Sequence, residues 1–320
     1  MNDIKPQIDQ EKILTLLNNN FDAPIEDLDS IQSGEVARVF SFRVGQNAYI
    51  LRINTLNMAA SFYKEDLIYR QMVSPNIPIP PIVKVDRTAD FVYAITQKLP
   101  GSGLDALSPA GYHAILPELI HILHAVHTSD VSRWTGYGAF DDSGRGLAAS
   151  WRSYLAAVID EEAPDGYFGK WHSLFTTTFL ERGFHDTVYK FMIDLLPACP
   201  EERFFVHGDF GYNNILAYQG KITAVLDWLN AMYGDIVYDV AWMTFWRPEP
   251  VFSEMFRQYY ADHGMTLDHY EDRIACYHAY IGLNALKFYA KAQNQPAYQY
   301  TVQILQRLLS DRGSEVENKP

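Results

Sequence analysis

Polar side chains flank a short predicted hairpin in the stretch VHGDFGYNNILAYQGKITAVLDW, with His207, Asp209 and Asn214 before it and Asp227 after it. The segments NILAY and KITAVL have the composition of strands, and Gln219–Gly220 joins them where glycine can adopt a positive φ. Strand pairing brings the two outer ends of a hairpin together. Carboxylate and amide oxygens from both ends then form an oxygen-rich corner of the kind that Mg²⁺ requires.

The order of these residues is more specific than their types. Each one alone is more often a turn former that satisfies loose backbone groups. Together they follow the pattern His-x-Asp-x-x-x-x-Asn, then a hairpin, then Asp. This is the order of a kinase catalytic loop followed by its metal-binding Asp, so the pattern predicts phosphoryl transfer.

The composition indicates a folded globular protein. The chain has 320 residues, is 48% hydrophobic, and carries a formal net charge of −13 from 26 basic and 39 acidic residues. An acidic balance disfavours a nucleic-acid or anionic-membrane partner, and no apolar run approaches the roughly 20 residues of a membrane span. Cys199 and Cys276 lack the spacing of a metal site, and the polar N-terminus does not read as a signal peptide. We therefore expect a cytoplasmic protein with reduced thiols.

The first third of the chain reads as β-rich. Residues 38–54 alternate as two strands around a turn at 45–47, and residues 91–99 form a buried strand. Between them, residues 61–73 have the pattern of a helix capped by Ser61. This part of the chain supplies the sheet that must position any residue on these strands.

The remainder of the chain reads as helical. Apolar residues recur at helical spacing over 114–127, where Pro117 begins or kinks the helix. From Val251 onward we expect mostly helices, followed by a frayed tail at 311–320. We expect two lobes, with a hinge near their boundary at residue 100: residues 1–100 and residues 101–320.

At this point the sequence resembles a known family. The segments HGDFGYNN, VLDW and MYGDIVYDVAW are similar to the aminoglycoside phosphotransferase family, a branch of the protein-kinase-like proteins. The flanking segments SGEVARVFSFRVGQNAYILRIN and FWRP resemble the branch that phosphorylates hygromycin B. The resemblance covers nearly the whole chain. It implies an α+β, bilobal protein-kinase-like fold with a β-rich N-lobe and a mainly helical C-lobe.

The resemblance assigns roles to the polar residues of the hairpin region. Asp209 matches the catalytic base that accepts or orients the proton of the substrate hydroxyl. Asn214 and Asp227 match the ligands of Mg²⁺, with Asn214 preferred over the adjacent Asn213 by the family spacing. His207 is expected to make structural hydrogen bonds in the loop.

The predicted nucleotide site lies on the first lobe. Arg52 matches the residue that grips the ATP phosphates, and strand alternation places it on the same face as Ile50, which could cover the adenine. Glu65 is the expected partner of Arg52, with Asp66 as the alternative. Val39, at the end of the loop SGEVARV, could pack on the adenine. The expected hinge, whose backbone would pair with the adenine edge, includes Thr96, Gln97 and Leu99.

Two further aspartates follow the hairpin. Asp239 precedes an apolar helical run, which favours a helix cap. Asp235 in YGD is expected to brace the catalytic loop.

We therefore expect a monomeric kinase that uses ATP, with GTP left open, and Mg²⁺ to phosphorylate a cationic aminocyclitol antibiotic, hygromycin B in particular. The alternatives are a kinase of another small alcohol, such as choline, homoserine, methylthioribose or a macrolide, and a nucleotide-binding pseudokinase scaffold. A cationic acceptor would suit an acidic site. Candidate acidic residues in the helical part are Asp160, Glu161, Glu162, Asp165, Asp268, Glu271 and Asp272.

Overall fold

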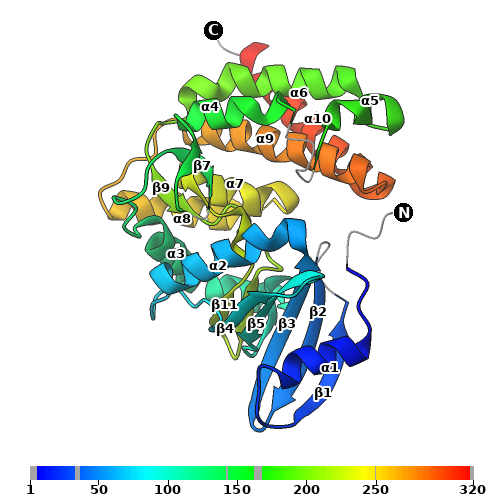
Figure 1. The fold of residues 1–320 in the computed structure, drawn as a ribbon. Coiled ribbons are helices and arrows are strands. Elements are labelled where there is room, and N and C mark those ends of the chain that lie inside the picture. The colour runs from blue at the N-terminus through cyan, green and yellow to red at the C-terminus, as the bar shows by residue number, and fades with distance from the viewer. Residues whose placement is uncertain (1–5, 33–36, 142, 162–167, 249, 318–320) are drawn as a thin grey trace. The chain divides into compact units, whose positions relative to one another are not determined.

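The structure is a computed structural model, and the residues it describes are 6–32, 37–141, 143–161, 168–248 and 250–317 (Figure 1). Backbone contacts divide the chain into two compact units. Unit 1 is made of Met1–Ala125 and Tyr212–Leu229, and unit 2 of Val126–Gly211 and Asn230–Pro320. The hairpin that follows the His207–Asp209 segment therefore belongs to unit 1. The predicted lobe boundary after residue 100 lies within unit 1 and remains a proposal.

Unit 1 contains a five-stranded antiparallel sheet with the strand order β1-β2-β3-β5-β4 (Figure 1). Its strands are β1 Ile25–Ile31, β2 Arg38–Val44, β3 Asn47–Thr55, β4 Ile82–Arg87 and β5 Phe91–Gln97. Gly45 adopts a φ of 59° between β2 and β3, as a tight hairpin turn requires. The two strands and the turn predicted for residues 38–54 are confirmed.

One face of this sheet forms the core of unit 1. Phe40, Phe42, Leu51 and Ile53 are buried there, and helix α1 (Gln10–Asn18) covers them with its own apolar residues. Burial of each such side chain contributes about 1.5–3 kcal/mol. Because strand residues alternate, Ile50 and Arg52 must lie on the opposite face, as predicted.

Helix α2 spans Ala59–Met72 and begins earlier than predicted. Ser61 is not its cap. The short 3₁₀ helix Leu56–Met58 leads directly into α2, so Ser61 lies in the first turn and its hydroxyl donates to the Met58 carbonyl at 2.6 Å. This register buries Glu65 and Lys64 and leaves Asp66 half-buried.

The rest of unit 1 consists of a small sheet and one long helix. The sheet has the order β11-β10-β6, formed by β6 Ser102–Gly103, β10 Ile215–Tyr218 and β11 Lys221–Val225. The pairing of β10 with β6 explains why the hairpin clusters with unit 1. Helix α3 spans Pro109–His127 and ends in unit 2, so Pro117 lies inside it and does not begin it.

Unit 2 combines a four-stranded sheet with a set of helices (Figure 1). The sheet has the order β8-β7-β12-β9, with β7 Tyr137–Phe140, β8 Gly146–Ala148, β9 Phe204–Val206 and β12 Met232–Gly234. The helices are α4 Trp151–Ala156, α5 Leu174–Thr177, α6 Arg182–Leu195, α7 Val237–Trp246, α8 Pro250–Asp262, α9 Tyr270–Lys291 and α10 Gln295–Glu317.

Helix α9 is the centre of unit 2, because α6, α7 and α10 all pack against it. The helical content predicted after Val251 is confirmed. The frayed tail predicted from Asp311 is wrong as far as Glu317, since the backbone of α10 stays helical to that residue. Within the described part of the chain, no helix is both long and apolar enough to cross a membrane.

Candidate active site

The loop His207–Gly211 follows β9 in unit 2 and carries Asp209; we call it the catalytic loop after the role predicted for Asp209. Its backbone is held by the Asp239 carboxylate, which accepts from the His207 N–H at 2.9 Å and from the Gly208 N–H at 2.8 Å. The His207 ring is fully buried, and its Nδ1 accepts from the Asp209 N–H at 3.2 Å. His207 therefore makes the structural hydrogen bonds that were predicted for it.

Gly208 is required by the path of this loop. Its φ is 78°, and a Cβ at this position would lie 2.0 Å from the Asn230 carbonyl oxygen. Any other residue would be strained by its backbone conformation and would collide with a neighbouring main chain. The close approach therefore fixes the backbone immediately before Asp209.

The side chain of Asp209 is only half-buried. Asn230 donates from Nδ2 to Asp209 Oδ2 at 3.4 Å, a long hydrogen bond. A fixed backbone with a partly exposed carboxylate is what a base needs in order to accept a proton from a substrate hydroxyl.

The roles predicted for Asp235 and Asp239 are both wrong. Asp239 lies inside the first turn of α7, fully buried, and braces the catalytic loop instead of capping the helix. Asp235 accepts from the Val237 N–H at 3.1 Å, next to the start of α7. The N-cap of α7 is Ile236, so Asp235 lies one residue before the cap and its side chain accepts from the first N–H of the helix.

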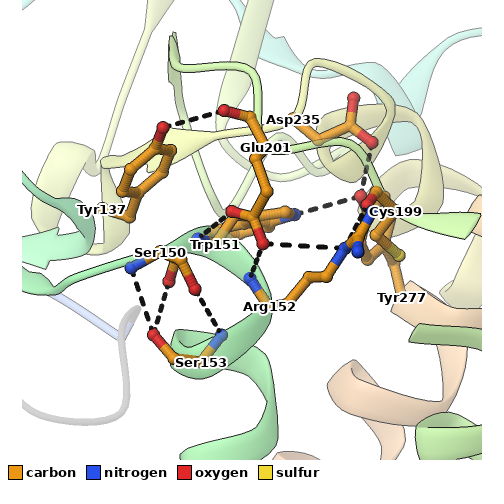
Figure 2. Close-up of polar contacts among 9 residues, drawn as sticks. All are labelled: Tyr137, Ser150, Trp151, Arg152, Ser153, Cys199, Glu201, Asp235 and Tyr277. Carbon is orange, nitrogen blue, oxygen red and sulfur yellow. Dashed lines mark hydrogen bonds and ion pairs between the residues drawn. The ribbon is translucent and has the colours of Figure 1, made fainter. Parts of the chain in front are cut away.

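Asp235 also ties α7 to α9. Arg273 donates to Asp235 from Nε at 2.8 Å and from Nη2, and the Tyr277 hydroxyl donates to the same carboxylate. Tyr277 in turn accepts from the Trp151 indole N–H at 3.0 Å, so the network continues into α4 (Figure 2). Burial of a charged pair is tolerated here because both oxygens of Asp235 have donors.

A second buried contact stands behind Asp239. His127 Nε2 lies 3.0 Å from Asp239 Oδ2, and its Nδ1 lies 2.7 Å from the Tyr260 hydroxyl. Because a carboxylate only accepts, Nε2 carries a hydrogen, and in the neutral ring Nδ1 accepts from Tyr260. The brace of the catalytic loop therefore extends through α3 to α8.

In unit 1, the hairpin β10–β11 brings the two predicted metal ligands to one end. Ile215 pairs with Val225, and the Leu226 N–H donates to the Asn214 carbonyl at 2.7 Å. Asn214 is buried with 6% of its surface exposed, whereas Asn213 is exposed. The exposed Asn213 side chain points to solvent, so the burial of Asn214 agrees with the choice of Asn214 as the predicted Mg²⁺ ligand.

Asp227 follows β11 with a left-handed backbone, at a φ of 58°. Although solvent reaches its side chain, the surrounding protein raises the pKa of Asp227, and the nearby Glu65 carboxylate raises it further. Arg52 and the Leu229 N–H oppose this increase in the pKa. A cation bound at Asp227 would relieve the same repulsion from Glu65.

The side-chain oxygens of Asn214 and Asp227 are suitable ligands for a Mg²⁺ ion that is also bound by nucleotide phosphates. Mg²⁺ usually takes one or two carboxylates and completes its shell with water and phosphate oxygens. Across the described ranges, no group of three or more His, Cys, Asp or Glu side chains could hold a metal ion by itself. A donor pair that depends on phosphate oxygens is consistent with that finding.

Arg52 pairs with Glu65, as predicted. Arg52 Nη1 donates to Glu65 Oε1 at 3.1 Å, and Nη2 donates to Oε2, so the pair is bidentate. Asp66 instead accepts from Arg70 on the surface of α2 at 2.9 Å. The direction of each side chain on α2 therefore distinguishes the two acidic neighbours.

The residues predicted to cover the adenine share the Arg52 face of the sheet. Val39 lies opposite Arg52, and Ile50 lies opposite Thr96, in antiparallel register. Directly opposed residues point to the same side of a sheet, so these four side chains form one surface. The preceding loop residues 33–36 lie outside the described residues.

The predicted hinge presents one backbone donor. The Gln97 N–H donates to Pro81 and the Lys98 N–H donates to Ala48, both at 2.9 Å. Within the described chain, the Leu99 N–H makes no backbone hydrogen bond. Leu99 therefore has the donor that the edge of a purine could accept from.

The candidate acidic residues for the acceptor are mostly on the surface of unit 2. Asp160, Glu161, Asp268 and Glu271 are exposed, and Asp272 is half-buried. Glu162 and Asp165 lie outside the described residues. Each remains a candidate.

Several residues that organise the site were not predicted from the sequence. They belong to no motif and reach their partners over long separations: Lys64, His127, Tyr260, Arg273 and Tyr277. The one available signal was the type of residue, since Lys and Arg at buried helix positions need a partner.

Comparisons with known proteins agree with this geometry. A model of the phosphotransferase enzyme family matches residues 27–272. Hygromycin-B 4-O-kinase from Escherichia coli is 32% identical over 286 residues, which cover 88% of this chain and 80% of that protein. Aminoglycoside 3'-phosphotransferase from Escherichia coli is 23% identical over 185 residues, covering 55% of this chain and 60% of that protein.

Solved structures show the same fold. A thermostable mutant of aminoglycoside phosphotransferase APH(4)-Ia, in ternary complex with AMP-PNP and hygromycin B, matches with a TM-score of 0.79 and 28% identity, covering 93% of this chain and 98% of that chain. The GDP complex of aminoglycoside 2'-phosphotransferase-IIIa matches with a TM-score of 0.65 at 14% identity, covering 95% of this chain and 100% of that chain, and supports the fold alone. The predicted α+β, protein-kinase-like fold is confirmed.

Proposed function

The chain belongs to the phosphotransferase enzyme family, and from this premise we propose that it transfers the γ-phosphoryl group of ATP to a hydroxyl of hygromycin B. The observation that carries the proposal is the 32% identity to Hygromycin-B 4-O-kinase over 88% of the chain, together with the Asp209, Asn214 and Asp227 pattern. By analogy with that relative, the acceptor is the 4-hydroxyl group. Phosphorylation would give resistance to the antibiotic.

Asp209 is the proposed catalytic base. Its carboxylate orients the acceptor hydroxyl and takes its proton as the new phosphate ester forms. The loop brace at Asp239 supports this role, because it removes backbone freedom before substrate binds.

Residues of unit 1 are proposed to bind the nucleotide. Asn214 and Asp227 would hold Mg²⁺, which neutralises charge on the phosphates when bound. Arg52 would grip the phosphates, oriented by its bidentate pair with Glu65. Ile50 and Val39 would cover the base.

The backbone of the hinge would recognise the base edge. The Leu99 N–H, which no backbone group in the described chain accepts, would donate to the purine. Thr96 and Gln97 would adjoin it from the end of β5. The purines of ATP and GTP both offer an acceptor to this N–H. A competition experiment between the two nucleotides would show which one is the phosphoryl donor.

An ATP-dependent reaction suits a cytoplasmic enzyme, because ATP is abundant inside the cell. The charge of −13 suits a cationic acceptor and disfavours a nucleic-acid partner. We further propose that the protein acts as a monomer, which the mass in solution would test.

The direct test is ADP release against a panel of acceptors. Purified protein with ATP and Mg²⁺ should turn over hygromycin B, and the product should gain one phosphoryl group at the 4-hydroxyl by NMR. Other aminoglycosides, choline and homoserine serve as comparison acceptors. Good turnover of a neutral alcohol without turnover of hygromycin B would overturn the substrate, and no ADP release with any acceptor would favour a scaffold.

A further inference from the structure

Lys64 is a buried cation that the proposed function does not use. It lies on α2 next to Glu65, with only 7% of its surface exposed. Its Nζ donates to the Leu229 carbonyl at 2.7 Å, over a separation of 165 residues in the chain. Burial lowers the pKa of Lys64 to about 8, which reflects the cost of removing the ammonium group from water.

Leu229 connects this cation to Asp227. The Leu229 N–H donates to the Asp227 carboxylate, while the Leu229 carbonyl accepts from Lys64. Both backbone groups of one residue are therefore occupied, one by the proposed metal ligand and the other by α2. Movement of Leu229 would move the donor that orients Asp227.

The backbone at Asp227 needs such support. A φ of 58° is in the left-handed region, which costs a residue other than glycine free energy. Conformations of this kind persist where the surrounding structure holds them. The hydrogen bond from Lys64 fixes the chain two residues after Asp227.

The charged groups around Asp227 also connect Lys64 to the proposed metal site. The Asp227 carboxylate is repelled by Glu65 and attracted by Arg52. Lys64 is attracted by Glu65 and adds a second positive charge to this group. Two cations and two anions thus lie together in unit 1, and Lys64 is the member that reaches the turn after Asp227 through a backbone contact.

We propose that Lys64 is a positioning residue for the metal site: it holds Leu229 in place, and through Leu229 it presents the Asp227 carboxylate to Mg²⁺. The inference rests on the proposed function, because it assumes that Asp227 binds Mg²⁺ with a nucleotide. The positioning role proposed for Lys64 differs from a general stabilising role. A stabilising contact would affect the whole unit, whereas a positioning contact acts on the metal-dependent part of nucleotide binding.

The experiment compares nucleotide affinity with and without metal. A non-hydrolysable ATP analogue is titrated into the wild type, Lys64→Met and Arg70→Met, in Mg²⁺ and again in EDTA. Arg70 is the matched control, since it is a cation on α2 that pairs with Asp66 at the surface. Thermal melting without ligand checks the fold of each variant.

Lys64→Met should weaken nucleotide binding in Mg²⁺ by at least about tenfold, the change expected on losing one hydrogen bond to a charged group. Its affinity in EDTA should stay close to that of the wild type, and Arg70→Met should match the wild type in both conditions. In an Asp227→Asn background, Lys64→Met should have little further effect. If Lys64→Met does not fold, Lys64→Gln keeps a donor without the charge and should show a smaller loss in Mg²⁺ alone.

Equal losses in Mg²⁺ and in EDTA would overturn the inference in favour of a structural role. Unchanged affinity in both conditions, in a wild type that does depend on Mg²⁺, would also overturn it and would leave the proposed function intact. A wild type whose nucleotide affinity ignores Mg²⁺ would overturn the proposed function, and the inference with it.

Discussion

The catalytic loop of unit 2 and the turn after β11 in unit 1 each present one aspartate, yet they are held in different ways. The loop before Asp209 is fixed by backbone N–H groups that donate to the buried Asp239. The turn at Asp227 is surrounded by charges, with Arg52 and Lys64 offsetting Glu65.

The difference matches the proposed tasks. A base needs a fixed position and a carboxylate with an ordinary environment, so buried hydrogen bonds to its backbone suffice. A metal ligand must be oriented toward the cation, and in the proposed metal site the negative charges of Asp227 and Glu65 are balanced by Arg52 and Lys64. Substitutions in the catalytic loop should therefore lower kcat, whereas substitutions around Asp227 should weaken nucleotide binding.

The largest effect is expected at Asp209. Asp209→Asn should lower kcat by about 10²–10⁴-fold, because the amide cannot accept the proton of the hydroxyl. Nucleotide affinity should be nearly unchanged, since proton acceptance by Asp209 matters only along the reaction path. Steady-state kinetics and a nucleotide titration check both parts. A kcat of Asp209→Asn within tenfold of the wild type would show that Asp209 is not the catalytic base.

Removal of the loop brace should have the next largest effect. Asp239→Ala leaves the N–H groups of His207 and Gly208 without acceptors, which should lower the free energy of unfolding by about 2–6 kcal/mol. The milder Asp239→Asn keeps one acceptor oxygen. At a temperature far below its melting point, it should still show reduced kcat with unchanged KM for ATP. A normal kcat in a folded Asp239→Asn protein would contradict the brace.

Arg52 tests the charged region. Arg52→Ala should raise the KM for ATP about tenfold to a hundredfold, because a charge-assisted hydrogen bond to phosphate is lost, while the KM for the acceptor stays constant. Arg52→Lys should recover part of the loss, since it keeps the charge without the fork. Arg43→Ala on β2 is the control, because Arg43 is a surface cation of the same sheet. Equal behaviour of Arg52→Ala and Arg43→Ala would show that Arg52 is only a strand residue.

The smallest effect concerns a buried histidine of unit 2 whose Nδ1 lies 3.6 Å from one acidic neighbour, Asp186. His185 is fully buried, and in the described structure its ring nitrogens have no hydrogen-bond partner. Burial, with the charges of Lys287 and His172, lowers the pKa of His185 to about 4 against the opposing effect of Asp186. Protonation therefore favours the unfolded chain.

The stability that depends on neutral His185 is complete above pH 6.5 and is lost as the pH falls toward 4. The loss is at most about 3 kcal/mol, since one pKa unit corresponds to about 1.4 kcal/mol. His185→Phe cannot be protonated and should flatten the decline of the melting temperature between these pH values. An identical pH profile for the variant and the wild type would show that His185 does not contribute to acid sensitivity.

Much of the architecture follows from local patterns. Alternation over residues 38–54 determined both the hairpin and the face that carries Arg52. The order of Asp209, Asn214 and Asp227 in the chain indicated the candidate site residues, and the hairpin brings Asn214 and Asp227 to the same end. The roles of these residues in catalysis and metal binding remain predictions.

Only the tertiary structure decided the roles that depend on distant partners. Nothing local separates Asp235 from Asp239, since both sit near the start of one helix; their roles are set by Arg273 of α9 and by the backbone of the catalytic loop. Glu65 differs from Asp66 by the direction in which α2 points each side chain. Sequence periodicity fixes which face of an element is apolar, but it carries no information on which buried donor meets which acceptor. Packing between elements far apart in the chain makes that choice, because each buried polar group must find a partner there.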